Sequence, residues 1–398
     1  MTPRPPAIVV LSNIFDPHYH DVRGEKIAIC MTTACRRDLF LCLEMASGRE
    51  LILLSSPPKA AERCKGRWLP AVETKFVTFR QFFCANWDIP KLRIPLSWFL
   101  YARHVVRHVR SGDLVVIDNY EFIYIVAAWV LKTFRRVTFI LAYLDGKHLI
   151  DHGWDRVLSG LAEIGGRPLL NGAVLSTPSL RERLPDSLPK EVVPGPGFVS
   201  KELPSKPSVP DKEVRFLYAG ALDRTRGVDL LLESLEYLPE YGWHLVIAGQ
   251  GPLTEHIIRF TQDPRWRGKV EYHQPLPPTT DAFKQMVAAS HVGLNCQRTS
   301  DPISNMTFPT KIFTYLSAGL LVISSKASSV APVCGNACLY YEEETPQSLA
   351  AAMKEVMANF SVVRRKLDPT GVSNQYSIEA TAGRMRRLFQ AAGVAGDR

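Results

Sequence analysis

The sequence predicts an α/β protein with two doubly wound domains joined by a proline-rich linker. Three observations support this prediction. A chain of 398 residues is too long for one ordinary hydrophobic core. Short apolar runs, typical of buried parallel strands, alternate with helical segments along most of the chain. The alternation breaks between about 194 and 212, where proline and glycine are frequent.

The first predicted domain covers residues 1–195. Its apolar runs are short enough for strands and are separated by segments long enough for helices. The strands are expected at 8–11, 51–54, 114–117, 137–142 and 173–176, with a helix ending near Met45 and another over 122–133.

The second predicted domain covers residues 213–375, after a linker at 196–212. Its expected strands are 215–218, 244–248, 270–273, 292–295 and 320–324, with helices over 227–238, 280–289 and 309–318. A break is expected near 369–374. The last helix, over 377–392, then lies in a C-terminal segment, 376–398, which we expect to pack back on the first domain.

The net charge is +9 and the pI about 9.1, and residues 1–195 carry 26 Lys and Arg against 19 Asp and Glu. A basic balance of this size is consistent with solubility, with an anionic ligand such as a nucleotide diphosphate, or with an anionic membrane surface. No zinc-finger, helix-turn-helix or RNA-recognition signature is present, so nucleic acid is not an expected partner.

The cysteine pattern and the apolar segments predict the compartment. The eight cysteines include no C-x-x-C pair, and we interpret them as core thiols in a reducing environment. The first apolar run is too short for a signal peptide, and no segment is long enough to span a bilayer. The sequence therefore predicts a cytoplasmic protein, with the cytoplasmic face of a membrane as an alternative location.

The first loop with a chemical pattern follows the strand at 215–218 and contains Gly220, Arg224, Arg226 and Gly227. Glycine lets a backbone approach a ligand closely, and arginine suits phosphate oxygens beside a helix N-terminus. This pattern favours phosphate binding, and an ordinary strand-to-helix loop with solvated arginines is the alternative.

Two further segments of the second domain resemble ligand-binding elements. Gly249 and Gly251 form a turn between a strand and a helix, where close packing against a base or sugar is expected. The segment 304–319 opens a helix at Pro309 and Thr310 and places Lys311 in its first turn, with Thr314 one turn later. The helix dipole disfavours a cation there unless an anion shares the site. A plain amphipathic helix with a solvated lysine is the alternative.

These three motifs, in this order and spacing, give the C-terminal half a family resemblance. About 214–360 resembles the nucleotide-binding domain of two-domain retaining glycosyltransferases, family four in the usual classification. The first half resembles the family only in its strand–helix rhythm. The resemblance implies two Rossmann-like doubly wound domains facing across a cleft, the GT-B fold.

The resemblance also implies roles for individual residues. It places Arg226 and Lys311 near the donor diphosphate and Gly249 and Gly251 beside the base and ribose. Thr314 stands where most members carry a glutamate that holds the ribose. The remaining predicted donor-binding residues are Gly220, Arg224, Asn305, Pro309 and Thr310.

The sequence departs from the family at two further positions. Met306 replaces a second family glutamate, and Ala221 stands where many members have an arginine. Asn305 or Asp301 is the candidate for replacing the missing polar contact.

In the first domain, the loop after the first strand contains Asp16, His18 and His20, which we expect to bind the acceptor. Asp145 and His148 follow the strand at 137–142, where family members often place a polar residue near the reacting sugar. We take these two as the candidate catalytic residues, with ordinary loop residues as the alternative.

Residues 94–110 combine aromatic and basic side chains in one expected helix. Such a helix favours peripheral contact with an anionic membrane, and an amphipathic helix packed on its own sheet is the alternative. The aromatic residues are Trp98, Phe99 and Tyr101, and the basic ones are Arg103, His104, Arg107, His108 and Arg110.

The sequence therefore predicts a glycosyltransferase of the hexosyltransferase class, acting in polysaccharide or glycoconjugate synthesis. It would move a sugar from a nucleotide-sugar donor to a glycan or lipid-linked acceptor. Cationic side chains can stabilise the charge on a leaving diphosphate, and no paired aspartate motif is present, so we expect no metal and no cofactor. Retention of configuration is implied by the resemblance. A non-catalytic partner subunit with the same fold and a nucleotide-sugar epimerase are the alternatives.

Overall fold

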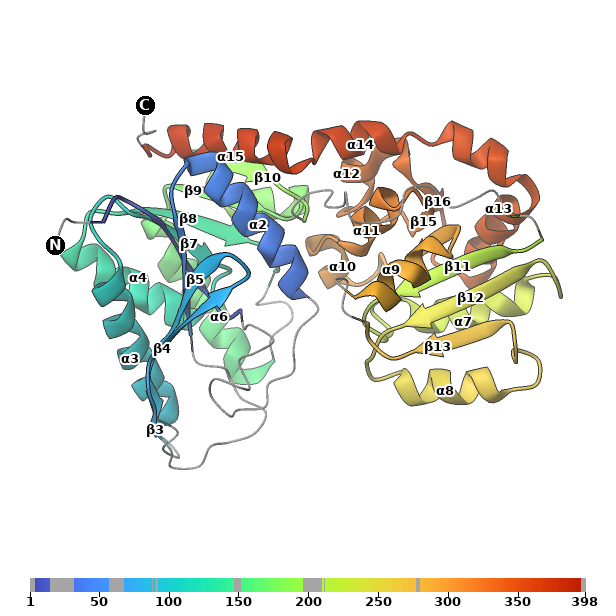
Figure 1. Ribbon diagram of the computed structural model, residues 1–398, viewed down its shortest axis with the longest axis horizontal. Coiled ribbons are helices and arrows are strands. Elements are labelled where there is room, and N and C mark those ends of the chain that lie inside the picture. Colours follow the sequence, from blue (N-terminus) through green and yellow to red (C-terminus); the bar gives the residue numbers. More distant parts are fainter. Residues whose placement is uncertain are drawn as a thin grey trace. The chain divides into compact units, whose positions relative to one another are not determined.

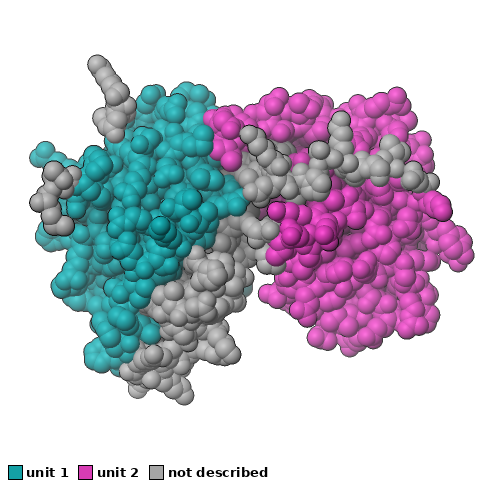
Figure 2. Space-filling view, viewed as in Figure 1, with its two compact units in different colours: residues 1–176, 180–193, 381–398 teal, residues 177–179, 194–380 magenta. Residues whose placement is uncertain are grey.

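The computed structural model describes residues 4–14, 32–56, 68–87, 89, 92–146, 152–195, 210, 212–276 and 280–394. The chain divides into two compact units, coloured separately in Figure 2. Unit 1 comprises residues 1–176, 180–193 and 381–398, and unit 2 comprises 177–179 and 194–380. Of the predicted linker, only Pro210 and Lys212 are among the described residues.

Unit 1 contains an eight-stranded sheet in the order β10-β9-β8-β7-β1-β2-β5-β4 (Figure 1). All neighbouring strands are parallel except β4 and β5. The strand order reverses between β1 and β7, which makes this the topological switch point of the sheet. The strands are β1 (Ile8–Ser12), β2 (Leu51–Ser55), β4 (Val72–Phe76), β5 (Phe79–Phe83), β7 (Leu114–Asp118), β8 (Thr138–Tyr143), β9 (Gly172–Leu175) and β10 (Lys190–Val192), with β3 (Trp68–Leu69) and β6 (Asn86–Trp87) forming a separate antiparallel pair.

Long helices pack with the sheet of unit 1. They are α2 (Thr32–Ser47), α3 (Arg93–His108), α4 (Phe122–Phe134), α6 (Gly153–Gly166) and α15 (Ile378–Ala391). In α15, the Arg386 guanidinium donates hydrogen bonds to the carbonyls of Met45 and Ala46 in α2. The last helix therefore packs beside a helix from the beginning of the chain, although more than three hundred residues separate them.

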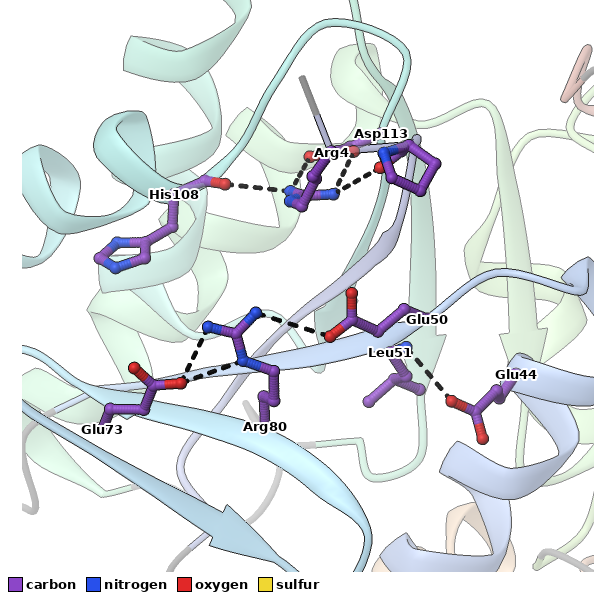
Figure 3. Close-up of polar contacts among 9 residues, drawn as sticks. Arg4, Glu44, Glu50, Leu51, Glu73, Arg80, His108 and Asp113 are labelled. Atoms are coloured by element: carbon purple, nitrogen blue, oxygen red, sulfur yellow. Dashed lines mark hydrogen bonds and ion pairs between the residues drawn. The ribbon is translucent and has the colours of Figure 1, made fainter. Parts of the chain in front are cut away.

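Ion pairs hold the edges of the unit 1 elements together (Figure 3). The Arg4 guanidinium donates to both oxygens of the buried Asp113 carboxylate, at 2.7 and 3.1 Å, and ties the start of the chain to the turn before β7. Arg80 on β5 pairs with Glu73 on β4 at 2.8 Å, but both side chains are about half exposed. The first pair is shielded from water and the second is not, so only the first is expected to contribute much to stability.

Unit 2 contains a six-stranded, fully parallel sheet in the order β13-β12-β11-β14-β15-β16. In chain order this is the 3-2-1-4-5-6 arrangement of a dinucleotide-binding fold, with its switch point between β11 and β14. The strands are β11 (Val214–Ala219), β12 (Trp243–Ala248), β13 (Val270–His273), β14 (Val292–Asn295), β15 (Leu321–Ser325) and β16 (Leu339–Tyr341).

Alternating residues of the unit 2 strands face two separate cores, as the period of a strand requires. Phe216 packs with the core around α7 and α13, whereas Leu217 packs with the core around α11 and α14. The helices are α7 (Val228–Ser234), α8 (Thr254–Gln262), α9 (Asp281–Ala288), α10 (Pro302–Met306), α11 (Lys311–Ser317), α12 (Ala331–Cys334), α13 (Pro346–Lys366) and α14 (Pro369–Gln375).

The predicted break at 369–374 is wrong, because these residues form α14. The Asp368 carboxylate accepts hydrogen bonds from the backbone N–H groups of Thr370 and Gly371, and Pro369 occupies the first helical position. Aspartate is a favoured N-cap residue, and proline fits the first position of a helix although it disrupts a helix interior. The pair Asp368-Pro369 therefore starts a helix and does not break one.

Candidate active site

The loop after β11 runs directly against the end of β14 at the switch point of unit 2. Gly227 has φ of 68°, and a Cβ atom at this position would collide with the carbonyl of Cys296. Within the loop, the Asp223 carboxylate accepts a hydrogen bond from the Arg226 N–H at 2.8 Å. The glycine therefore permits a close backbone approach that brings the arginine loop to the carboxyl end of β14.

Arg298 fixes this loop from the side of β14. Its guanidinium bonds the carbonyl of Arg224 at 3.1 Å, the Asp229 carboxylate at 2.9 Å and the Glu344 carboxylate at 3.0 Å. Burial acts to raise the pKa of Glu344, but hydrogen bonds from Ser300 and Arg298 outweigh it and lower the pKa to about 2. The sequence analysis missed this group, because its members are dispersed along the chain.

The predicted Gly249–Gly251 turn packs against the arginine loop. A Cβ atom on Gly249 would collide with the carbonyl of Gly220, and one on Gly251 with the carbonyl of Leu222. The two loops also exchange a hydrogen bond from the Leu222 N–H to the Gln250 carbonyl at 3.1 Å. Packing between the loops is therefore sufficient to require both glycines, and their predicted contact with base and ribose stays a prediction.

Helix α11 is anchored beneath the end of β11 by Tyr315. The Tyr315 hydroxyl accepts a hydrogen bond from the Ala219 N–H at 2.8 Å, and its ring lies where a side chain at position 293 would stand. This anchor places Lys311, the first residue of α11, at the same edge of the sheet. Its Nζ lies 3.9 Å from the centroid of the Tyr218 ring.

Tyr218 is a second residue that the sequence analysis missed. Its hydroxyl donates to the carbonyl of Ala221 at 2.7 Å, and its ring face receives the Lys311 ammonium. An aromatic face attracts a cation and partly replaces the lost water. Tyr218 thus connects the arginine loop to the lysine of α11.

The cations of this site are not neutralised. Burial, together with the nearby Arg226 charge, lowers the pKa of Lys311 to about 7, although Cys296 and Asp223 act in the opposite direction. In the part of the chain that the structure describes, no carboxylate forms an ion pair with Lys311, Arg224 or Arg226. A lysine whose ammonium group is buried beside an arginine is an unfavourable arrangement until an anion binds between them.

The other predicted donor-binding residues on and before α11 differ in burial and in whether their polar groups already have partners. Pro309 is buried, and Thr310 precedes α11 without capping it through its side chain. Thr314 is half-buried one turn after Lys311. The Asn305 amide is already occupied, because it donates to Thr299 and accepts from Ser328. Asn305 therefore holds two loops together, and its contact with a donor stays a prediction.

In unit 1, a polar cluster lies at the corresponding switch point between β1 and β7. The Asp118 carboxylate is buried, lies 2.7 Å from the Arg36 guanidinium and accepts a hydrogen bond from the Ser12 hydroxyl at 2.9 Å. Burial raises the pKa of Asp118, although Arg36 and Ser12 act in the opposite direction. The charges here are paired within the protein.

Asn119 connects this cluster to the predicted catalytic residue Asp145. Its backbone has φ of 59°, and its side-chain oxygen accepts hydrogen bonds from the N–H groups of Leu144 and Asp145 at 2.8 and 3.0 Å. Its amide nitrogen lies 3.4 Å from the Asp145 carboxylate. Asp145 is half-buried at the carboxyl edge of the sheet.

Four predicted residues of unit 1 cannot be placed at this edge. His148, the second candidate catalytic residue, lies outside the described residues. The same is true of the three predicted acceptor-binding residues, Asp16, His18 and His20.

The helix predicted over 94–110 is α3, but part of its aromatic and basic set faces inward. Tyr101 is buried and its hydroxyl donates to the Leu54 carbonyl at 2.7 Å. His104 is also buried, whereas Phe99, Arg103 and Arg107 are exposed. Among the described residues, no helix is long and apolar enough to cross a bilayer, and no group of three His, Cys, Asp or Glu residues is arranged to hold a metal ion.

Residues 213–359 match the sequence profile of the family described as Glycosyl transferases group 1. Unit 2 is therefore similar to the group 1 glycosyl transferases. The matched segment contains the three motifs on which the predicted resemblance rests, and that prediction is confirmed. No curated protein matches the chain in sequence.

Three solved structures show how far the glycosyltransferase fold extends along the chain. The lipopolysaccharide outer core galactosyltransferase WaaB is 13% identical with a TM-score of 0.64, and the match covers 97% of this chain and 99% of that one. HepE from Anabaena with UDP-glucose is 10% identical with a TM-score of 0.67, over 97% and 99%. Sucrose-phosphate synthase from Thermosynechococcus elongatus is 14% identical with a TM-score of 0.67, over 96% and 98%. The predicted fold class, two Rossmann-like α/β domains of the GT-B type, is confirmed, and at these identities the likeness establishes the fold alone.

Proposed function

We propose that this glycosyl transferase moves a hexose from a nucleoside-diphosphate sugar to a glycan or lipid-linked acceptor, with retention of configuration. The observation that carries the proposal is the unneutralised cationic edge of unit 2. Lys311 and Arg226 lie together at the switch point of a parallel sheet, where such folds bind phosphorylated ligands, and Arg224 belongs to the same loop as Arg226.

The chemistry of sugar transfer requires this kind of edge. As the bond to the anomeric carbon breaks, negative charge builds on the leaving diphosphate. A positioned ammonium and guanidinium stabilise that charge more in the transition state than in the ground state. Lys311 suits this role, because a bound diphosphate favours its charged form and raises its pKa from about 7.

Structures of proteins with the same fold support the donor class. HepE from Anabaena was solved with UDP and with UDP-glucose, and the catalytic domain of starch synthase IV from Arabidopsis thaliana with ADP and acarbose. We therefore propose a uridine or adenosine diphosphate sugar as the first donors to test.

We assign the acceptor side to unit 1. Asp145 is the proposed group at the reacting sugar, and Asn119 is a positioning residue that holds its backbone. Transfer in this account needs no resident metal, because the cations of unit 2 face the leaving group.

A non-catalytic subunit is the second candidate, and the departures at Thr314 and Met306 favour it. These positions lack the carboxylates that hold the donor in most family members. The retained cations count against it, because a lysine held beside an arginine without a paired carboxylate destabilises the free protein, and a bound anion would remove that cost.

The proposal is tested by incubating the purified protein with nucleotide sugars, with and without a pool of glycan and lipid-linked acceptors. Thermal unfolding is measured in parallel with UDP, ADP, GDP, dTDP and CMP. We expect one nucleotide to raise the melting temperature, and the sugar of the corresponding nucleotide sugar to be transferred. NMR of the product should show that the anomeric configuration of the donor is retained. Nucleotide binding without transfer would favour the non-catalytic subunit, and conversion of the free donor to an epimer would favour an epimerase. If the protein shows no nucleotide binding and no transfer, the proposed transferase activity and the epimerase alternative are both contradicted.

A further inference from the structure

Helix α6 presents an apolar stripe to solvent. Trp154, Val157, Leu161 and Ile164 are 81, 49, 52 and 68% exposed, and their spacing of three and four residues puts them on one face. The opposite face of the helix, which includes Ala162 and Gly166, is buried in unit 1. A surface helix of a water-soluble protein ordinarily places polar side chains where α6 places this stripe.

Helix α6 packs against α4, which also exposes apolar side chains. The Trp129 indole N–H donates to the Gly165 carbonyl of α6 at 2.9 Å, so the two helices are joined at this point. Trp129 is 43% exposed and Phe134 is 62% exposed. We call the exposed apolar side chains of these two packed helices, Trp129 and Phe134 of α4 and the stripe of α6, the α4–α6 surface.

The two helices and the residues directly after them also carry exposed cations. These are Lys132, Arg135, Arg136 and Arg156, together with Arg167, whose charge is paired with Glu163. Of the acids on α6, Glu163 is buried and paired with Arg167 at 2.9 Å, which leaves Asp155 as the exposed acid of that helix. The two helices therefore combine exposed aromatic and aliphatic side chains with exposed positive charges.

We propose that the α4–α6 surface docks on a membrane that carries anionic headgroups. Tryptophan prefers the boundary between headgroups and acyl chains, and lysine and arginine contact the headgroup phosphates. A second copy of the chain fits this surface poorly, because a symmetric interface would bring its cations together. Membrane docking does not depend on the identity of the donor. If the protein both docks on a membrane and transfers a sugar, a lipid-linked acceptor is favoured over a soluble glycan.

The test is co-sedimentation of the full chain with vesicles of phosphatidylcholine alone and of phosphatidylcholine mixed with phosphatidylglycerol. We expect binding to the anionic vesicles, and a loss of at least about tenfold in the W154S/L161S double variant, because each side chain loses its apolar burial in the bilayer. The R135Q/R136Q variant should bind anionic vesicles about fivefold more weakly per charge removed, and the effect should vanish at high salt.

The matched control is Tyr241→Ser, which removes an aromatic side chain that is 76% exposed in unit 2 and should leave vesicle binding unchanged. Because the stripe is exposed, the α6 variants should melt within a few degrees of the original protein. Equal binding by W154S/L161S and the original protein, or no binding to anionic vesicles at all, would overturn the proposal. A large fall in melting temperature would show that the stripe packs within the protein, and a change from dimer to monomer would assign it to a second copy; both overturn it.

Discussion

At the carboxyl edge where strand order reverses, the two sheets of this protein carry opposite electrostatic arrangements. Unit 1 places the buried Asp118 there, paired with Arg36 and bonded to Ser12. Unit 2 places Lys311 and Arg226 at the equivalent position, with no carboxylate paired to them among the described residues. The same topology thus supports a self-neutralised cluster in one unit and an unneutralised one in the other.

The difference separates two ways of building a site. The cluster of unit 1 is complete without a ligand, because Asp118 and Arg36 neutralise each other. Asn119, the residue after Asp118, holds Asp145 in place through hydrogen bonds. The cluster of unit 2 is incomplete, because its lysine loses hydration, and the face of Tyr218 and the more weakly acting Asp223 do not compensate for this loss. An incomplete site favours binding of an anion, and a complete one favours precise positioning.

The largest expected effect comes from removing the ammonium group of Lys311 in unit 2. Lys311→Met should lower the transfer rate by roughly 100- to 1000-fold, the cost typical of losing a group that stabilises leaving-group charge. The same change should stabilise the ligand-free protein by about 1–3 kcal/mol at neutral pH, because a buried ammonium is removed. Transfer kinetics and chemical denaturation measure the two effects separately.

The gain in stability should depend on pH. The folded-state pKa of Lys311 lies below its unfolded value, so the unfolded chain binds the extra proton between about 7 and 10.5. The stability of the original protein therefore rises with pH across this range, and the advantage of Lys311→Met shrinks accordingly. Lys269→Met is the control, since Lys269 also lies over a tyrosine, Tyr241, but at 5.9 Å. A loss of stability in Lys311→Met would contradict an unneutralised site.

The second effect comes from breaking the paired cluster of unit 1. Asp118→Asn leaves the Arg36 guanidinium without its buried counterion and should destabilise the protein by about 3 kcal/mol. Glu73→Gln, which breaks the exposed pair with Arg80, should cost less than about 1 kcal/mol. Equal costs in denaturant unfolding would mean that the cluster of unit 1 is not shielded as described.

The third and smallest effect tests the link from that cluster to the reaction. Asn119→Ala removes the acceptor for the N–H groups of residues 144 and 145, and should lower kcat by about tenfold through misplacement of Asp145. Nucleotide binding, measured by thermal shift, should not change, because the proposed donor-binding residues lie in unit 2. A variant with a normal kcat, or one with an altered nucleotide affinity, would break the division of roles between the units.

Much of the fold was predictable because strands and helices leave periodic patterns. The apolar runs predicted the main strands, and the motif helix at 309–318 predicted α11 within two residues. The short strands β3 and β6, the helix α6 and the helix α14 were missed or mispredicted. In α14 an aspartate cap determines the start, and in α6 the exposed stripe removes the polar face that ordinarily identifies a helix.

The site was predictable only in part. Lys311 and Arg226 stand in local motifs, so their sequence neighbourhood indicated phosphate binding. Tyr218, Arg298 and Asn119 act through contacts between segments far apart in the chain, and each resembles an ordinary core or loop residue in sequence. The glycines at 249 and 251 differ again, because loop packing alone is sufficient to require them and their contact with a donor stays a prediction.

The central claim, that unit 2 holds an unneutralised lysine for a diphosphate, is tested most directly by calorimetry of nucleotide-sugar binding at pH 7. Titrations in buffers of different ionisation enthalpy count the protons taken up on binding. Because the pKa of Lys311 is about 7 and a bound diphosphate raises it, the account predicts uptake of about half a proton per donor, absent in Lys311→Met. Binding with no proton uptake, or equal uptake in the variant, would contradict it.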